Sequence, residues 1–114
     1  MDTIVHELFD AIDSNRWERL PELFDAEVVY ERPGYEPFRG LERLDRFYRE
    51  ERVIANGCHH LTGVVVGDGQ AACWGRFVGV HRDGSPIDVD FADTYELADG
   101  RIRVRKTFFY RPAV

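Results

Sequence analysis

Apolar residues in the first half of the chain recur at helical spacing. Residues 3–13 place their apolar side chains on one face, which predicts an amphipathic helix. A second short helix is predicted from Asn15, where Glu18 follows three residues later as in a capping box. Pro21 has no backbone N–H, so we expect it to kink this helix or to begin a new turn. A third helix is predicted over about residues 41–53.

Beyond Gly57 the apolar period changes from helical spacing to strict alternation. The predicted strands cover residues 58–66, 71–81, 87–97 and 101–110. The three turns between them each contain an Asp-Gly pair, at 68–69, 83–84 and 99–100. Four strands on three tight turns form an antiparallel meander. A short strand at 28–30 must join this meander or pair elsewhere. Helices followed by strands are typical of the α+β class.

Composition narrows the classes of partner. A chain of 114 residues, 44% hydrophobic and 32% charged, predicts one folded domain over residues 1–114. The net charge of −6 argues against nucleic acid and against an anionic membrane surface. The two cysteines do not form a disulfide framework, and no apolar run approaches the roughly 20 residues of a membrane span. We therefore expect a cytoplasmic protein.

The strand at 87–97 carries the most informative departure from its pattern. Alternation places its apolar residues, Phe91 among them, on the inner face, and the same alternation places Asp93 there. A carboxylate among apolar side chains costs several kcal/mol unless it is paired, hydrogen-bonded or protonated. Asp93 is therefore a candidate acid, base or hydrogen-bond donor. The alternative is a structural ion pair, or a strand bend that exposes the side chain.

The neighbouring strand predicts companions for Asp93. A two-residue turn at 83–84 places Trp74 opposite Asp93 and Arg76 diagonal to it, on the same face. Such a cluster on a concave apolar wall suits an oriented carbonyl or enol oxygen. An internal salt bridge capped by Trp74 is the alternative. A longer or bulged turn would overturn this register.

Adjacent histidines and the absence of cofactor motifs bear on the chemistry. His59 and His60 lie next to each other on a strand, so one points inward and the other outward. An inward histidine could act as a general acid or base, or be a core residue without that role. The spacing of His and Cys fits no common metal site, and no nucleotide-binding or serine-hydrolase motif occurs. We expect neither metal nor cofactor.

The order of elements and three sequence stretches resemble the nuclear transport factor 2-like fold, and within it the SnoaL-like and ketosteroid isomerase-like family. The stretches are Tyr30-Glu31-Arg32-Pro33, Arg39 to Arg43 leading to Phe47-Tyr48-Arg49, and Phe91-Ala92-Asp93 before Asp99-Gly100-Arg101-Ile102. The resemblance implies a cone-shaped α+β barrel, in which three N-terminal helices pack on a curved, mixed, mainly antiparallel sheet. Members of this fold often form dimers through the outer sheet face.

This sequence retains only part of the site that ketosteroid isomerases use. Arg32 stands where these enzymes carry their carboxylate base, and Phe9 stands where they carry an oxyanion-hole tyrosine. Asp93 matches their protonated aspartate, and Tyr48 matches a tyrosine of the same network. The resemblance therefore does not favour steroid isomerisation.

The catalytic residues of SnoaL-like polyketide cyclases and limonene-epoxide hydrolases match this sequence better than those of ketosteroid isomerases do. The cyclases use a pocket aspartate as acid–base catalyst without a metal, which by resemblance is Asp93, with His59 as the inward histidine. The hydrolases carry an Asp–Arg–Asp set, for which Arg76 and Asp93 could stand as two members. In the last strand, alternation places Ile102, Val104, Lys106, Phe108 and Tyr110 inward, whereas the family pattern favours Arg105, Thr107 and Phe109.

Three readings of the function follow. The first is a small cofactor-independent enzyme for cyclisation, isomerisation, dehydration or epoxide opening of an apolar, oxygen-bearing metabolite. Asp93 and His59 would be its catalytic residues, and the residues that bind or shape the substrate site would be Arg32, Arg76, Trp74, Tyr30, Phe91 and Tyr48. The second is a non-catalytic module that binds an apolar small molecule. The third is a purely structural homodimer in which Asp93 and Arg76 are locked together.

Overall fold

The computed structural model describes residues 3–112 and contains three helices before a long meander of strands. Helix α1 spans Thr3–Asp13, a 3₁₀ turn spans Trp17–Arg19, and α2 spans Leu20–Leu23. Helix α3 spans Leu41–Arg46 and continues as a π-helical turn over Phe47–Glu51. The strands are β1 (Phe24–Glu31), β2 (Phe38–Arg39), β3 (Ile54–Val66), β4 (Gln70–His81), β5 (Pro86–Ala98) and β6 (Arg101–Phe109). Within residues 3–112, no helix is long and apolar enough to cross a membrane.

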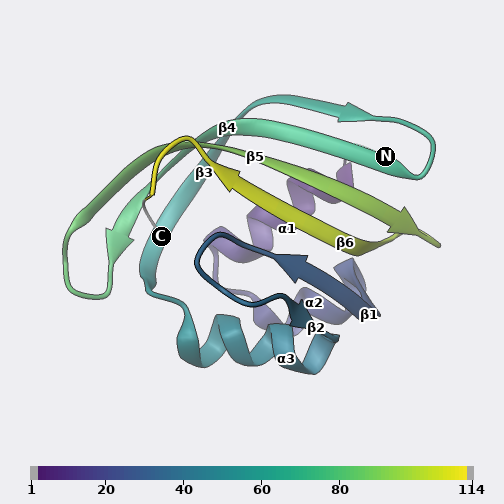
Figure 1. The fold of residues 1–114 in the computed structure, drawn as a ribbon, viewed down its shortest axis with the longest axis horizontal. Coiled ribbons are helices and arrows are strands. Elements are labelled where there is room, and N and C mark those ends of the chain that lie inside the picture. The colour runs from purple at the N-terminus through teal and green to yellow at the C-terminus, as the bar shows by residue number, and fades with distance from the viewer. Residues whose placement is uncertain (1–2, 113–114) are drawn as a thin grey trace.

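One six-stranded sheet organises the molecule, in the order β2-β1-β6-β5-β4-β3. All neighbouring strands are antiparallel except β1 and β6, which run parallel. The sheet curls over α1 without closing, and α3 lies below it on the same concave side (Figure 1). The predicted α+β fold, with three helices on a mixed, mainly antiparallel sheet, is confirmed.

The core lies between α1 and the concave face. The inward side of α1 contributes Val5, Leu8, Phe9, Ala11 and Ile12, all buried. The sheet meets them with Phe77, Val89 and Phe91. Burying such side chains stabilises the fold by roughly 1.5–3 kcal/mol each. Several polar side chains are buried on the same concave face, and they form the site.

The end of α3 differs from the regular helix predicted over 41–53. The backbone N–H of Arg52 donates to the carbonyl of Phe47 at 2.9 Å, which closes a five-residue π turn. Phe47, Tyr48 and Arg52 are all buried. π turns are rare and occur frequently at functional sites. Here the turn directs the Tyr48 and Arg52 side chains toward the interior.

The register predicted between β4 and β5 is wrong by one residue. The N–H of His81 donates to the carbonyl of Ser85, so the loop contains three residues, and Gly84 has a φ of 91°. This is a type I turn followed by a left-handed glycine, which is a common three-residue hairpin. A shift of one residue exchanges the two faces of a strand. Trp74 and Arg76 therefore lie on the outer face.

Contacts on that outer face confirm the correction. Trp74 is 43% exposed and lies across Gly63 of β3. Arg76 is exposed and forms an ion pair with Asp88 of the neighbouring strand. The residue opposite Asp93 on β4 is Cys73. The proposed inner cluster of Asp93, Trp74 and Arg76 therefore does not exist.

A β-bulge in β6 explains why two patterns competed there. Leu97 pairs with Ile102, but Glu96 pairs with Val104, so Arg103 is an extra residue in β6. Before the bulge Ile102 faces inward, as alternation predicts. Beyond it the phase reverses. Arg105 and Thr107 are then buried, Phe109 is half-buried, and Lys106 and Phe108 are exposed, as the family pattern favoured.

Candidate active site

Asp93 is fully buried on the concave face of β5, and its predicted inward orientation is confirmed. Its Oδ2 accepts hydrogen bonds from the Tyr95 hydroxyl at 2.7 Å and from Arg105 Nε at 2.9 Å. Its Oδ1 accepts a hydrogen bond from Thr107 Oγ1 at 2.7 Å. Thr107 lies directly opposite Asp93 on β6. Both carboxylate oxygens therefore have partners within the fold, which is the arrangement that a buried charge requires.

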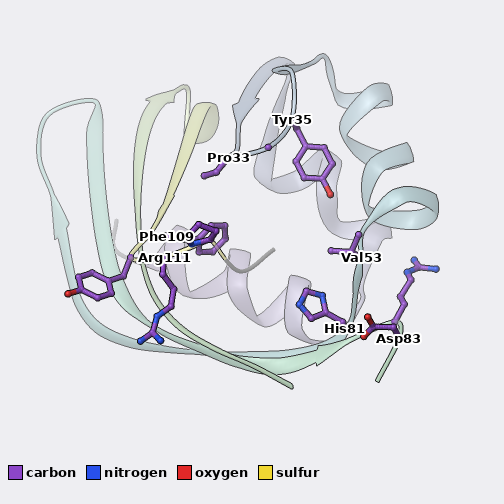
Figure 2. A pocket seen from close by; sticks show the side chains of 11 residues that line it. Pro33, Tyr35, Val53, His81, Asp83, Phe109 and Arg111 are labelled. Carbon is purple, nitrogen blue, oxygen red and sulfur yellow. The ribbon is translucent and has the colours of Figure 1, made fainter. Parts of the chain in front are cut away.

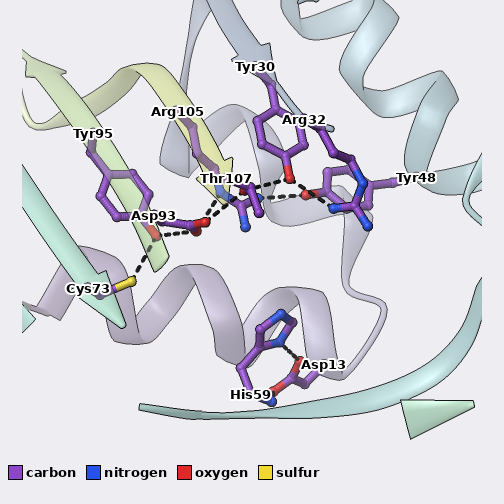
Figure 3. A network of polar contacts seen from close by, with 10 residues as sticks. All are labelled: Asp13, Tyr30, Arg32, Tyr48, His59, Cys73, Asp93, Tyr95, Arg105 and Thr107. Carbon is purple, nitrogen blue, oxygen red and sulfur yellow. Dashed lines mark hydrogen bonds and ion pairs between the residues drawn. The ribbon is translucent and has the colours of Figure 1, made fainter. Parts of the chain in front are cut away.

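A directed chain of hydrogen bonds runs from Asp93 to Arg32 (Figure 3). Because Thr107 donates its only hydroxyl proton to Asp93, the Tyr30 hydroxyl at 2.8 Å must donate to Thr107 Oγ1. The Tyr30 oxygen in turn accepts from Arg32 Nη1 at 2.9 Å. Each donor is thus polarised by the next, and the orientation of the whole chain is fixed.

Arg105 links the Asp93 carboxylate to Tyr48. Its Nη1 donates to the Tyr48 hydroxyl at 2.8 Å, so the Tyr48 proton remains available for another acceptor. Burial acts to lower the pKa of Arg105, but the Asp93 carboxylate, with Tyr30 and Tyr48, holds that pKa well above its ordinary value. Burial raises the pKa of Tyr48. At neutral pH the site therefore contains a fixed guanidinium and a neutral phenol.

Tyr30 and Cys73 have opposite electrostatic surroundings. Burial acts to raise the pKa of Tyr30, but the Arg105 and Arg32 guanidinium groups outweigh it and lower that pKa below 10.0. Burial, reinforced by the Asp93 carboxylate, raises the pKa of the Cys73 thiol to about 11. Its Sγ lies 3.4 Å from the Tyr95 hydroxyl. A thiol with such a pKa is a poor nucleophile at neutral pH, whereas Tyr30 is a strengthened hydrogen-bond donor.

A second polar group, the His59–Asp13 pair, lies across the cavity from Asp93. The Nδ1 of His59 is 2.6 Å from Asp13 Oδ1, and its backbone N–H donates to Asp13 Oδ2 at 2.9 Å. With Asp13 ionised, Nδ1 carries the proton and Nε2 has a free lone pair. Figure 3 shows Nε2 on the side of the ring that faces the Asp93 network. His59 is thus the inward histidine, whereas His60 is exposed.

Aromatic rings surround the His59 imidazole. Phe9 stacks on it at 4.3 Å between ring centroids, and Phe77 and Phe91 lie at 4.5 and 5.2 Å. Burial by these rings lowers the pKa of His59 below 6.5, although the Asp13 carboxylate acts in the opposite direction. The neutral form, which can accept a proton, is therefore the form present at neutral pH.

Two cavities share the Phe109 side chain. A small one of about 20 Å³ is lined by Asp93, Arg105 and His59, among others. A large, open one of about 1040 Å³, called the mouth below, has Tyr35, His81 and Phe109 pointing into it (Figure 2). Phe109 lines both cavities. The small cavity has room for about one water molecule, and Phe109 lies between it and the mouth.

Most of the residues predicted for the site are brought together. Those that line the small cavity are Asp93, His59, Arg32, Tyr48 and Phe91. Tyr30 lies behind them, within the hydrogen-bond chain. Sequence reasoning missed Asp13 and Arg52, and Arg105 was suggested only by the family pattern. Asp13 ends the amphipathic helix α1, but its contact spans 46 residues, and nothing local indicates it.

Donors outnumber acceptors at the small cavity. No group of three or more His, Cys, Asp or Glu side chains suited to a metal gathers within residues 3–112. The cavity is lined instead by three arginines and Tyr48, with Asp93 as its only carboxylate. Because Asp93 is already bonded to three donors, the arrangement suits a ligand that brings its own acceptor oxygen.

Comparison with known proteins places the chain in a family. The curated proteins gave no match. Solved structures with the same fold include a provisionally named SnoaL-like polyketide cyclase from Jannaschia sp. CCS1, which is 18% identical with a TM-score of 0.81 over 95% of this chain and 83% of that one. An LEH-like epoxide hydrolase from M. tuberculosis is 15% identical, with a TM-score of 0.82 over 94% of this chain and 80% of that one. An NTF2-like protein of unknown function from Burkholderia pseudomallei K96243 is 14% identical, with a TM-score of 0.85 over 94% of this chain and 88% of that one. At such identities the likeness establishes the fold alone. The sequence model of the SnoaL-like domain matches residues 5–105, and the chain therefore belongs to the SnoaL-like domain family.

Proposed function

We propose that this protein is a cofactor-independent enzyme that applies acid–base chemistry to an apolar, oxygen-bearing metabolite. The reaction class is cyclisation, isomerisation, dehydration or epoxide opening. One observation carries the proposal: His59 is held by Asp13 at 2.6 Å, and its imidazole lines the same cavity as Asp93. A base fixed in one tautomer beside a set of oriented donors is the equipment that such reactions require.

His59 is the base in this proposal. Its Nε2 takes a proton from carbon or from water, and the resulting imidazolium is stabilised by the Asp13 carboxylate at Nδ1. The same imidazolium then returns the proton to oxygen or carbon, so the site ends as it began. General acid–base catalysis of this kind contributes typically 10²–10⁴-fold to the rate.

Tyr48 serves the reacting oxygen of the substrate, and Arg32 orients the substrate beside it. The Tyr48 hydroxyl accepts from Arg105, which polarises its own proton toward an acceptor. Asp93 has a positioning role here, since its two oxygens already accept three hydrogen bonds. This assigns proton transfer to His59 and orientation to Asp93, while Phe91 supplies apolar wall and Tyr30 aligns Arg32.

The mouth is the proposed route for the substrate. Its apolar lining includes Pro33, Tyr35 and Val53. Phe109 stands between this mouth and the small cavity, with its ring 5.3 Å from the Arg32 guanidinium carbon. The apolar body of a substrate would occupy the mouth, and its reacting oxygen would pass Phe109 to reach the donors.

Proton exchange tests the base without knowledge of the natural substrate. The probe is 2-tetralone, an apolar ketone with acidic α-protons, incubated with the protein in D₂O and followed by NMR. The wild type should exchange these protons faster than buffer. H59Q should lose 10²–10⁴-fold of the catalysed rate, and the matched control H60Q should retain it, because His60 is exposed on the opposite face.

The alternative of a non-catalytic binding module predicts a different result. In that case the α-protons of 2-tetralone would exchange at one common rate with the wild type, H59Q and H60Q. Such equality would contradict the enzymatic proposal. Native mass spectrometry of the purified protein would then identify the bound apolar molecule.

We also propose that the protein forms a homodimer through the outer face of the sheet. Trp74, Ala92 and Phe108 lie directly opposite one another on three neighbouring strands, and Trp74 and Phe108 are 43% and 47% exposed. Contiguous exposed apolar side chains of this kind mark interaction surfaces. Sedimentation of the wild type should give a dimer, and W74D should give a monomer. A monomeric wild type at micromolar concentration would contradict the proposal.

A further inference from the structure

Two guanidinium groups beside the small cavity have unsatisfied N–H donors. The Nε atoms of Arg32 and Arg52 are buried, and neither has a hydrogen-bond partner within residues 3–112. Both side chains line the small cavity. A buried donor without an acceptor costs about 1–3 kcal/mol, and more when it is charged. A folded protein can bear this cost in its ligand-free state if a bound ligand supplies the missing acceptor.

The described chain supplies no carboxylate to either arginine. Across residues 3–112, no Asp or Glu lies within ion-pair distance of Arg32 or Arg52. Burial lowers the pKa of Arg52, and the positive charge of Arg32 lowers it further. The two cations are therefore close enough to repel each other. An anion placed between them would remove both penalties.

Aromatic rings hold the two arginines in place. The Arg32 guanidinium carbon lies 5.6 Å from the centre of the Phe47 ring and 5.3 Å from that of Phe109. The Arg52 carbon lies 5.9 Å from the Trp17 ring and 5.7 Å from the Tyr48 ring. Cation–π contacts of this kind fix orientation without neutralising the charge. The donors are therefore positioned in advance of any ligand.

A neutral carbonyl would not satisfy this arrangement, because it leaves the net charge unchanged. The lining of the small cavity holds three arginines against one carboxylate. Planar guanidinium groups match a carboxylate in bidentate geometry. The free proton of Tyr48 adds a third donor to the same cavity. The geometry therefore favours a ligand that is anionic before any reaction begins.

We infer that the substrate carries a carboxylate on an apolar body, and that Arg32 and Arg52 bind this carboxylate. The inference deepens the proposed function, on which it rests for the location of the site. The apolar body lies in the mouth, whose lining carries two arginines, Arg82 and Arg111, against one carboxylate, Asp83, and so adds to the attraction of an anion. Since the small cavity holds about one water, the Phe109 ring must turn to admit the carboxylate.

Matched neutral and charged probes test this inference by calorimetry. The charged probes are acetate, benzoate and 2-naphthoate, and the neutral partner of the last is 2-naphthamide. We expect 2-naphthoate to bind at least about tenfold more tightly than 2-naphthamide, the difference that one charged hydrogen bond supplies. R32Q and R52Q should remove this preference. R52K, which keeps the charge, should retain part of it.

R76Q is the control, because Arg76 lies on the outer face and is paired with Asp88. It should keep the full preference for 2-naphthoate. Equal affinities for naphthoate and naphthamide in the wild type, or an unchanged preference in R52Q, would overturn the inference. Failure of all three carboxylates to bind would also overturn it. Because binding needs no base, H59Q should still prefer 2-naphthoate even if the exchange experiment contradicts catalysis.

Discussion

Arg105 and Arg52 are two buried arginines with opposite surroundings. Arg105 is 3% exposed, donates to Asp93 and Tyr48, and is surrounded by oxygen acceptors. Arg52 is 5% exposed, and its guanidinium packs on Trp17 and Tyr48 without an acidic partner in residues 3–112. A buried cation whose partner is built into the fold acts as part of the scaffold. One without a partner is available to a ligand.

The hydrogen bonds divide the concave face in the same way. Around Asp93 each oxygen has a donor, and the chain through Thr107 and Tyr30 has a fixed direction. On the other side of the small cavity, Tyr48 keeps a free proton and His59 keeps a free lone pair. The satisfied half should therefore determine stability, and the unsatisfied half should determine binding and reactivity.

The largest expected effect comes from breaking the satisfied half. R105Q leaves the Asp93 carboxylate buried without its ion-pair partner, and D93N leaves the guanidinium likewise. Each should lower the free energy of unfolding by about 3–5 kcal/mol, measured by urea denaturation. A loss below about 1 kcal/mol in R105Q would show that this pair is not the scaffold described above.

Removing both charges sharpens the same point. In D93L/R105M neither charge is left alone, and apolar side chains of similar size fill the space. The double variant should be more stable than either R105Q or D93N, because replacing a whole buried ion pair is often neutral or stabilising. A double variant that loses as much as the sum of the single changes would argue against unpaired charge as the cause.

The next effect is the contrast provided by Arg52. R52Q removes a cation that has no acidic partner in the described chain and that Arg32 repels. Its free energy of unfolding should fall by no more than about 1 kcal/mol, the scale of a cation–π contact, in the same urea experiment. If R52Q were as unstable as R105Q, the two buried arginines would have the same structural role.

A smaller effect concerns pH. Burial lowers the pKa of His59 below its ordinary 6.5, so the unfolded chain takes up this proton at a higher pH than the folded one. The stability from neutral His59 is therefore complete above pH 6.5 and is lost as pH falls through the folded pKa. Unfolding between pH 7.5 and 5 should show a flatter profile for H59Q than for H60Q. Parallel profiles would exclude His59 as the source.

The smallest effect should come from the outer ion pair. Arg76 and Asp88 are both exposed, and exposed pairs contribute little because water and salt screen them. The test is made in W74D, which disrupts the proposed dimer: there the added R76Q change should leave the urea concentration of unfolding the same, within error. A clear loss of stability in that background would mean that the Arg76–Asp88 pair supports the fold despite its exposure.

Strands β4 and β5 show how much of the site could be predicted from the sequence. The alternation of β5 is regular, so the inward position of Asp93 followed from its neighbours alone. On β4 the same reasoning failed, because it depended on the length of one turn. Both faces of β4 carry large apolar side chains, Phe77 inside and Trp74 outside, so burial could not correct the error. One unrecognised loop residue displaced Trp74 and Arg76 from the site.

Long-range contacts account for the rest of what sequence reasoning missed. The His59–Asp13 pair joins a helix end to a strand 46 residues away. Arg52 faces inward only because a π turn interrupts the predicted helix. Neither feature leaves a local pattern of apolar and polar residues. The resemblance nevertheless identified His59, Arg105 and Thr107 as inward, where the alternation of apolar and polar residues alone did not.

The extra residue at position 103 bears on how this protein should be compared with others. A relative that keeps this residue but forms no bulge would present the counterparts of Lys106 and Phe108 to its pocket, and would turn those of Arg105 and Thr107 to solvent. A relative that lacks one residue there would pair regularly and keep the counterparts of Arg105 and Thr107 inward, one position earlier in its chain. Column-by-column transfer of functional residues beyond this point therefore requires that the one-residue gap is placed at the bulge, because an error of one column exchanges the residues of the cavity for those of the surface.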